Sequence, residues 1–374
     1  MVIIIYKLYN RIQIQVCGVS PSLIRFLEAG DAKNLKKFYD EAYGSKHILH
    51  SPIHQDWQFK KNPFNTFNRV TIVLDENENE ITSHCGLIPV ELKVLNSTRS
   101  ALWHVSFFTL ERYRGQGLGT KLIQYSNNLC DFSMVLNGSD GTKKIYVNTG
   151  GKDLGNLNRY VGLLDKNRVE EFSRITIPKN QLNFVSNLNP DFKRVFNLDQ
   201  KYEKFWEKVK EKFPITVNRT MEYLDWRYLK HPLLDYHFMI LEKNNELVGF
   251  TVLRFEDKNE VLKAIRIVDL VVLSGYEREF LQHMVNYCKG KGHFMDFFCS
   301  GKFYRDDFER EGFFNNTDLN LPIPSVFNPI DVNRRSHINF FYNAVDKDVP
   351  NKEILDDVNN WYFVKADSDQ DRAN

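Results

Sequence analysis

The stretch Tyr113-Arg114-Gly115-Gln116-Gly117-Leu118-Gly119-Thr120-Lys121-Leu122-Ile123 decides the fold of this chain. The apolar residues before it, 103–110, predict a β-strand, and the apolar-periodic residues after it, 120–129, predict a helix. Glycines let a backbone come close to a ligand, and the first N–H groups of a helix have no partner within the helix. Because the positive end of the helix dipole lies behind those groups, the stretch predicts an anion-binding loop of the phosphate type.

Two familiar phosphate-binding patterns do not fit this loop. No Gly-Lys-Ser/Thr follows a first glycine, as a nucleoside-triphosphate loop requires. Gly115, Gly117 and Gly119 alternate with single residues, whereas the dinucleotide fingerprint is Gly-x-Gly-x-x-Gly. The remaining pattern, Arg114-x-x-Gly117-x-Gly119, resembles the pyrophosphate loop of the GNAT superfamily of acyl-CoA-dependent N-acyltransferases, which reads Gln/Arg-x-x-Gly-x-Gly/Ala. The alternative interpretation is a tight strand-to-helix turn that binds no ligand.

The GNAT resemblance implies that acyl-CoA is the co-substrate and that no metal takes part. It also implies a strand that splays from its neighbour, so that free backbone groups pair with the pantetheine amides and one N–H donates to the oxyanion. Arg114 would add positive charge near the phosphates. The implied CoA-binding residues are Phe108, Thr109, Leu110, Arg114, Gly115, Gln116, Gly117, Leu118, Gly119, Thr120 and Asn156.

Composition and length narrow the class of protein. A chain of 374 residues predicts about two domains, and 42% hydrophobic with 26% charged residues are typical of soluble globular proteins. A net charge of +2 argues neither for nor against nucleic acid, and we expect small-molecule partners without nucleic acid or membrane. Five scattered cysteines favour reduced thiols in a cytoplasmic protein and predict no metal site. A homodimer is compatible with all of this.

The chain contains an internal repeat. Asp56-Trp57-Gln58-Phe59-Lys60-Lys61-Asn62-Pro63 resembles Asp225-Trp226-Arg227-Tyr228-Leu229-Lys230-His231-Pro232, and the two octapeptides lie 169 residues apart. Each copy continues with a predicted strand, a polar turn and a second strand, beginning at Val70 and at His237. Each copy then offers one more strand and a helix, which in the second copy are residues 267–273 and 277–288. Two copies of one α/β unit therefore explain the length of the chain.

The second copy lacks the glycine loop, because Leu273-Ser274-Gly275-Tyr276-Glu277-Arg278 stands in its place. We therefore expect one CoA site, in the first half. The predicted fold class is α/β (α+β), with two tandem GNAT-like units that each carry a mixed, mostly antiparallel sheet flanked by helices. The predicted domains are an N-terminal extension over residues 1–20, a GNAT domain with the acyl-CoA site over 21–190, and a degenerate GNAT-like domain contributing to the acceptor site over 191–374.

A narrower resemblance concerns the acceptor. Trp226-Arg227-Tyr228, the following His231-Pro232 and the C-terminal residues 361–371 together are similar to bacterial N-acyltransferases found with surface-polysaccharide (O-antigen) genes. Those enzymes acylate nucleotide-linked amino sugars such as dTDP-3-amino-3,6-dideoxyhexoses, by direct attack in a ternary complex. The resemblance implies a dTDP-sugar or a related amino sugar as the second substrate.

The acceptor would lie between the two halves, because clefts between domains favour ligands. Candidate contacts are Trp226 and Tyr236 for stacking, Arg227 for a diphosphate, and Asp269 as a charge within an apolar strand. Trp226 duplicates Trp57, which favours a structural role in each unit. Asp269 is either one member of a structural ion pair or a ligand contact, since a buried carboxylate needs a partner.

Acyl transfer to an amine needs a proton acceptor near the thioester and a proton donor for the departing thiolate. His104 on the motif strand and Glu111 at its end are candidate bases, although a packed histidine, an exposed charge or a water chain are alternatives. Residues 144–148 predict a strand, and the GNAT resemblance places the acid tyrosine on the helix after it. Only Tyr160-Val161-Gly162 remains of the usual Tyr-x-x-x-Gly-Phe, so Tyr160 is the candidate acid on a weakened motif.

Two other functions compete with a sugar N-acyltransferase. Aminoacyl transferases that act on cell-wall peptides also have tandem GNAT-like units, but they usually lack an intact glycine loop. A non-catalytic CoA-binding protein of GNAT fold would keep the glycines without a base. The intact residues 114–119 count against the first of these alternatives.

Overall fold

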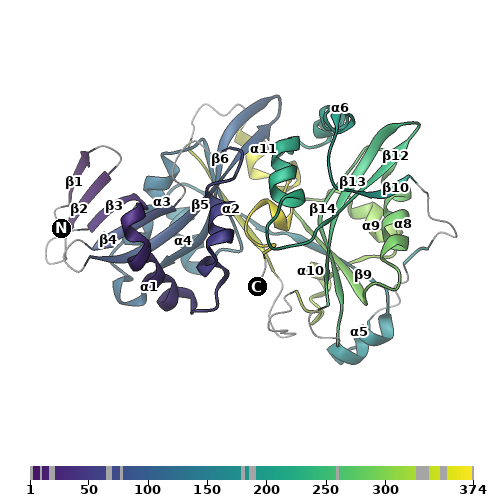
Figure 1. Ribbon diagram of the computed structural model, residues 1–374, viewed down its shortest axis with the longest axis horizontal. Helices are drawn as coiled ribbons and strands as arrows, with labels where there is room; N and C mark the ends of the chain where they lie inside the picture. Colours follow the sequence, from purple (N-terminus) through teal and green to yellow (C-terminus); the bar gives the residue numbers. More distant parts are fainter. Residues whose placement is uncertain are drawn as a thin grey trace.

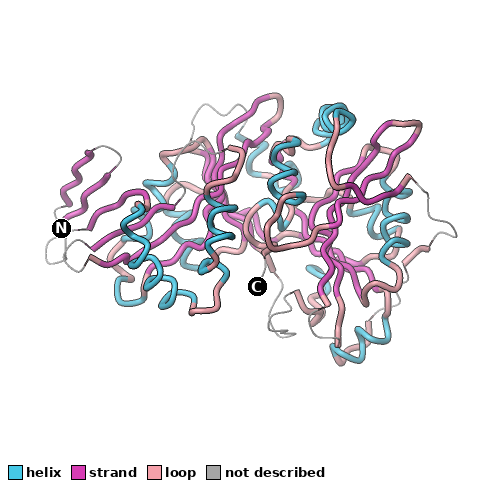
Figure 2. Tube along the Cα trace, viewed as in Figure 1, coloured by secondary structure: helices cyan, strands magenta, loops and turns pink. Residues whose placement is uncertain are grey.

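The computed structural model describes residues 3–8, 11–16, 22–64, 70–75, 79–177, 182–184, 191–257, 261–325, 337–345 and 352–372, with side chains from Ser22 onward except that of Lys352. Two β-sheets lie side by side, and the C-terminal segment lies between them (Figure 1). Helices pack around both sheets (Figure 2). No helix in these ranges is long and apolar enough to cross a membrane.

The first sheet contains the strand that precedes the glycine loop. Its order is β1-β2-β3-β4-β5-β6-β7-β17-β8, with β11 pairing β5 and β18 pairing β11. Neighbours pair antiparallel except β6 with β7 and β11 with β18, which are parallel. The strands are β1 Ile3–Leu8, β2 Arg11–Val16, β3 Ser22–Phe26, β4 Val70–Asp75, β5 Glu80–Val94, β6 Ser97–Thr109, β7 Phe132–Leu136, β8 Lys152–Asn156, β11 Ile215–Val217, β17 Asn339–Ala344 and β18 Trp361–Tyr362.

Helices cover both faces of this first sheet. Successive residues of β6 alternate between two buried clusters, because strand side chains point to opposite faces in turn. Trp103 packs in the cluster that includes helices α1 (Ala32–Tyr43) and α2 (Pro52–Phe59). Leu102 packs in the cluster of α3 (Leu118–Asn127) and α4 (Asp140–Asn148).

The second sheet follows the order β10-β12-β13-β14-β15-β9-β16 and is also mixed, with β14 and β15 parallel. Its strands are β9 Asn158–Leu163, β10 Phe192–Val195, β12 His237–Lys243, β13 Glu246–Glu256, β14 Ala264–Val272, β15 Phe294–Cys299 and β16 Phe314–Asn315. The remaining helices are α5 Lys166–Ser173, α6 Gln200–Val209, α7 Met221–Leu224, α8 Glu277–Cys288, α9 Arg305–Arg310, α10 Asn316–Leu319 and α11 Lys352–Asp356.

The predicted repeat of elements is confirmed by the two sheets. β4 and β5 form a hairpin in the first sheet, as β12 and β13 do in the second. β6 leads into α3 just as β14 leads into α8. The two repeated tryptophans meet: the Trp57 and Trp226 rings stack at 5.1 Å, and the indole N–H of each donates to the backbone carbonyl of the other at 2.9 Å. The repeated octapeptides therefore hold the two units together.

Three expectations about the chain's organisation differ from the structure. Residues 144–148 belong to helix α4 and not to a strand, and Tyr160 lies in strand β9 and not on a helix. β9 precedes residue 190 yet belongs to the second sheet, whereas β17 follows it and belongs to the first. Each sheet thus receives a strand from the other half of the chain. A domain boundary at residue 190, which adjoins the undescribed residues 185–190, therefore does not separate the two sheets. Within residues 1–20, β1 and β2 form a hairpin that extends the first sheet.

Candidate functional site

The glycine loop has the backbone shape that its sequence requires. Gly115 and Gly117 have φ angles of 81° and 76°, in the left-handed region that L side chains rarely adopt. Gly117 is the N-cap of α3, so the unpaired N–H groups of that helix begin directly after the turn. A Cβ on Gly119 would come within 3.0 Å of the Phe107 ring, which explains the third glycine by close packing of helix on strand.

A cavity of about 900 Å³ opens beside this loop. β6 and β7 pair only from Ala101–Trp103 to Phe132–Met134, although β6 continues to Thr109 and β7 to Leu136. The two strands therefore splay where the cavity lies, as expected. The cavity is lined by residues 104–109 and 135–139, by the glycine loop and the start of α3, and by α4. Its other lining residues are Tyr43 at the end of α1, His47 shortly after it, and Asp369, Gln370 and Arg372 near the C-terminus.

A bulge at Ser106 shapes the wall of the cavity. The register between β5 and β6 shifts between His84 and Gly86, and Ser106 has a φ of 49°. Its carbonyl accepts hydrogen bonds from the Tyr43 hydroxyl at 2.5 Å and from His84 Nδ1 at 2.9 Å. Tyr39 donates to His84 Nε2 at 3.0 Å, and burial lowers the pKa of His84 to about 4. A neutral imidazole with its proton on Nδ1 thus fixes the bulge.

The structure brings most of the predicted CoA-binding residues to this cavity. Phe108, Thr109, Arg114, Gly115, Gly117, Leu118, Gly119 and Thr120 line it. The Arg114 guanidinium lies 5.0 Å above the Phe108 ring, and its Nε donates to the Thr109 carbonyl at 3.1 Å. Leu110, Gln116 and Asn156 lie outside the lining; the Leu110 N–H is bonded to the Thr82 carbonyl at 3.0 Å, and Asn156 ends the exposed strand β8.

The three catalytic candidates have different surroundings. His104 lines the cavity, but its Nδ1 is 2.6 Å from the Tyr146 hydroxyl, and burial lowers its pKa to about 3, which makes it a poor proton acceptor at neutral pH. Glu111 lies outside the lining, with an 84% exposed side chain that pairs with Arg114 at 3.2 Å. Tyr160 is buried in the second sheet, stacks on Phe308 at 5.1 Å and does not line the cavity.

The four acceptor-binding candidates are buried by contacts within the protein. Arg227 Nε donates to the Ala366 carbonyl at 2.7 Å, and the Tyr236 hydroxyl donates to Asp371 at 2.7 Å. Asp269 accepts a hydrogen bond from Arg219 Nε at 2.9 Å, so of its two interpretations the structure shows the structural ion pair. The Trp226 indole N–H is already bonded to the Trp57 carbonyl. Of the four candidates, only Trp226 and Arg227 line a further cavity, of about 10 Å³. These residues therefore anchor the C-terminal segment and join the two units.

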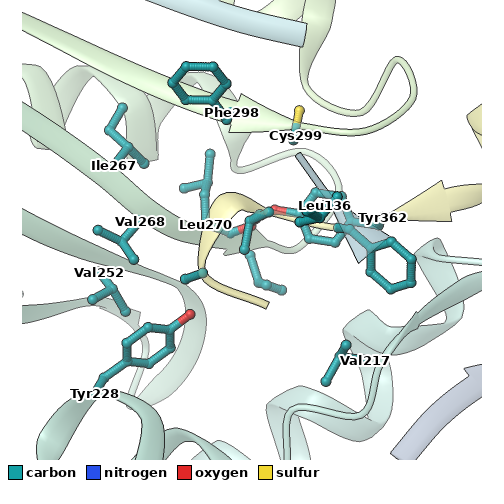
Figure 3. Close-up of a cluster of buried hydrophobic side chains, with 14 of the residues drawn as sticks. Leu136, Val217, Tyr228, Val252, Ile267, Val268, Leu270, Phe298, Cys299 and Tyr362 are labelled. Atoms are coloured by element: carbon teal, nitrogen blue, oxygen red, sulfur yellow. Dashed lines mark hydrogen bonds between the residues drawn. The ribbon is translucent and has the colours of Figure 1, made fainter. Parts of the chain in front are cut away.

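The equivalent strand gap of the second unit is filled by the chain itself. β14 and β15 pair up to Ile267 and Phe297, and β14 then continues to Val272. Tyr362 is drawn in one buried cluster with Leu270, Cys299 and Val217 (Figure 3). Its hydroxyl donates to the Leu270 carbonyl, and the Tyr304 hydroxyl accepts from the Val272 N–H at 3.0 Å. The C-terminal segment, through Tyr362, and the start of α9, through Tyr304, thus bond to the free edge of β14.

Among the lining residues that sequence reasoning did not assign to the cavity are Tyr43, His47, Asp369, Gln370 and Arg372. Burial lowers the pKa of His47 to about 4, and its ring stacks on Tyr43 at 4.7 Å. The three C-terminal residues are more than 230 positions from the glycine loop, so local patterns could not connect them. The run Asp367-Ser368-Asp369-Gln370-Asp371 behind an aromatic strand was the available signal.

Comparisons with known proteins identify the fold. No protein-family model and no curated protein matches the chain. A GCN5-related N-acetyltransferase from Anabaena variabilis is similar in structure, with a TM-score of 0.58 and 10% identity over 87% of this chain and 73% of that one. A second, from Kribbella flavida, has a TM-score of 0.54 and 11% identity, covering 88% and 72%. N-myristoyltransferase from Saccharomyces cerevisiae with bound myristoyl-CoA has a TM-score of 0.53 and 10% identity, covering 86% and 82%.

These similarities extend over most of the chain and therefore include both units. Together with the sheets and helices described above, they show two tandem GNAT-like units with mixed α/β architecture. At such low identity they show the fold alone. Within the described residues, no group of three or more His, Cys, Asp or Glu side chains is arranged to hold a metal ion.

Proposed function

We propose that this protein is an acyl-CoA-dependent N-acyltransferase whose donor site is the cavity of the first unit. The observation that carries the proposal is the glycine loop at the mouth of a gap between splayed strands. The N-terminus of α3 and Arg114 would hold the pyrophosphate, because both offer positive charge and N–H donors. Strand edges beyond Trp103 would pair with the pantetheine, since β7 no longer bonds to β6 there.

The chemistry is direct attack in a ternary complex. An amine that has lost its extra proton attacks the thioester carbonyl, so that a C–N bond forms and the C–S bond breaks. The CoA thiolate leaves and takes up a proton. The bulge at Ser106 interrupts the pairing of β6 with β5 beside the cavity, and a fixed N–H of β6 there could stabilise the oxyanion.

For the acceptor, we propose a nucleotide-linked amino sugar of the dTDP-3-amino-3,6-dideoxyhexose type, as in surface-polysaccharide synthesis. The support is that the C-terminal segment, which carries that resemblance, lines the cavity through Asp369, Gln370 and Arg372. Aromatic rings of Tyr43 and Phe108 stand on the same wall and would suit a sugar or a base. The contacts to the sugar would then come from this segment and not from Trp226 or Asp269.

Two measurements test this proposal. Calorimetric titration with CoA should give 1:1 binding, and absence of binding would favour the aminoacyl-transferase alternative. A thiol-release assay with acetyl-CoA and longer acyl-CoA should then show turnover that depends on an added dTDP-amino sugar. Binding of CoA without turnover on any amine would leave a non-catalytic CoA-binding protein.

A further inference from the structure

One carboxylate from the C-terminal segment stands in the wall of the large cavity. Asp369 is 6% exposed and is the only acidic residue among the described residues that line the cavity. Its Oδ2 lies 3.5 Å from the hydroxyl of Ser106, the bulge residue of β6. The carboxylate is therefore beside the strand along which the proposed function places the thioester.

The hydrogen bonds of Asp369 leave it able to accept another donor. Oδ1 accepts from Gln370 Nε2 at 2.8 Å, and Oδ2 accepts from Arg372 Nη1 at 3.2 Å and from Ser106. An ionised carboxylate has about four acceptor positions. These three donors thus leave about one position for a ligand that enters the cavity.

The second unit holds Asp369 in place from both sides. Before it, Asp367 bonds to Arg219 at 3.1 Å, and Arg227 Nη2 donates to the Ser368 carbonyl at 3.2 Å. After it, Asp371 accepts from Arg254 Nη2 at 2.7 Å. Burial alone would raise the pKa of Asp371, but the positive charges of Arg254 and Lys365 outweigh it and hold that pKa well below its usual range, so this anchor stays ionised. A side chain fixed in this way can meet a substrate group without reorganising.

Resting on the proposed function, we propose that Asp369 binds the amine of the acceptor beside the thioester, and so makes the enzyme select primary amines over alcohols. A primary amine in neutral water is largely an ammonium ion. Arg114 and Arg372 would repel it, whereas His47 is neutral through burial. Asp369 offers the one negative charge on the described wall. An alcohol gains less there, because it carries no positive charge and so adds no ionic attraction to its hydrogen bond with the carboxylate.

The test is Asp369→Asn, an isosteric change that removes the charge. Thiol release with acetyl-CoA and a dTDP-3-amino-3,6-dideoxyhexose should show the KM for the amine raised at least 10-fold. The affinity for CoA, from calorimetry, should change less than 2-fold. Asp369→Glu, which keeps the charge on a longer side chain, should recover part of the lost affinity for the amine.

Glu203→Gln is the matched control, because it removes an exposed carboxylate from α6. Thermal melting checks that each variant is folded. An unchanged KM for the amine in Asp369→Asn, with CoA binding intact, overturns this inference and leaves the proposed function standing. An equal loss of affinity for CoA and for the amine in Asp369→Asn also overturns it, since the residue would then be structural. If the unchanged protein binds no CoA, or transfers no acyl group to any amine, both proposals fail.

Discussion

The two units contain the same pair of splayed strands and differ in what occupies the gap. In the first unit, β6 and β7 separate after Trp103 and a cavity of about 900 Å³ opens between them. In the second, β14 and β15 separate after Ile267, and the C-terminal segment fills the space with Tyr362. The difference shows that an unpaired strand edge must be satisfied by something, either a ligand and water or another part of the chain.

A pair of glycine substitutions should give the largest difference between the two units. Gly117→Trp forces a bulky residue into a left-handed backbone at the mouth of the cavity. We expect CoA affinity to fall at least about 1,000-fold, equivalent to about 4 kcal/mol. Gly275 stands at the corresponding turn of the second unit with a φ of 93° and equally open surroundings, so Gly275→Trp is a matched control. Calorimetry should show its CoA affinity unchanged, and a comparable loss there would place a second site in that unit.

The second prediction concerns the buried charges behind the filled gap. Arg219 is fully buried between Asp269 and Asp367, at 2.9 and 3.1 Å. Arg219→Met leaves two carboxylates without their cation, which should lower the free energy of unfolding by about 3 kcal/mol. Urea denaturation measures the change, with the exposed Arg310→Met as control. A loss no larger than that of the control would show that these ion pairs do not stabilise the filled gap.

The third prediction sharpens the role of Tyr362. Tyr362→Phe keeps the ring but removes the hydroxyl that donates to the Leu270 carbonyl. A buried carbonyl left without a donor should cost about 2 kcal/mol of stability. The half-buried Tyr276→Phe serves as the matched control for removal of a hydroxyl. CoA binding should stay the same in both variants, and any gain of a second CoA site would mean that the hydroxyl alone closes the gap.

The smallest expected effect is a pH dependence of the folding stability that arises from His84, beside the open gap. The pKa of His84 is lowered by burial to about 4, from 6.5. Between pH 7 and 5.5 the unfolded chain therefore binds a proton at this histidine, whereas the folded chain does not. Acid thus lowers the free energy of unfolding by about 1 kcal/mol through this residue.

His84→Gln keeps a donor for the Ser106 carbonyl but removes the titration. The fall in stability from pH 7 to 5.5 should therefore be about 1 kcal/mol smaller than in the unchanged protein, as measured by urea midpoints at both values. The other buried histidines are present in both proteins and cancel in this difference. An identical fall in the two proteins would contradict the buried, neutral state of His84.

Local patterns predicted much of the fold and one side of the site. The strand and helix around the glycine loop, the paired hairpins and the duplicated Asp-Trp octapeptides all depend on neighbours in sequence, and each is present in the structure. The helix over 144–148 was missed because Ile145, Tyr146 and Val147 together favour a strand. There the Ser139 side chain caps the helix N-terminus by accepting from the Thr142 N–H at 3.2 Å.

The amino-acid sequence shows that one half carries a glycine-rich loop between a strand and a helix and that the other half is a copy without it. Which chain segments meet depends on long-range packing. It exchanges β9 and β17 between the two sheets, fills one strand gap with residue 362, and brings Asp369 to the wall of the other gap. The physical reason is that backbone geometry and helix capping act over a few residues, whereas satisfying a strand edge or a buried charge can recruit any part of the chain that packing brings near.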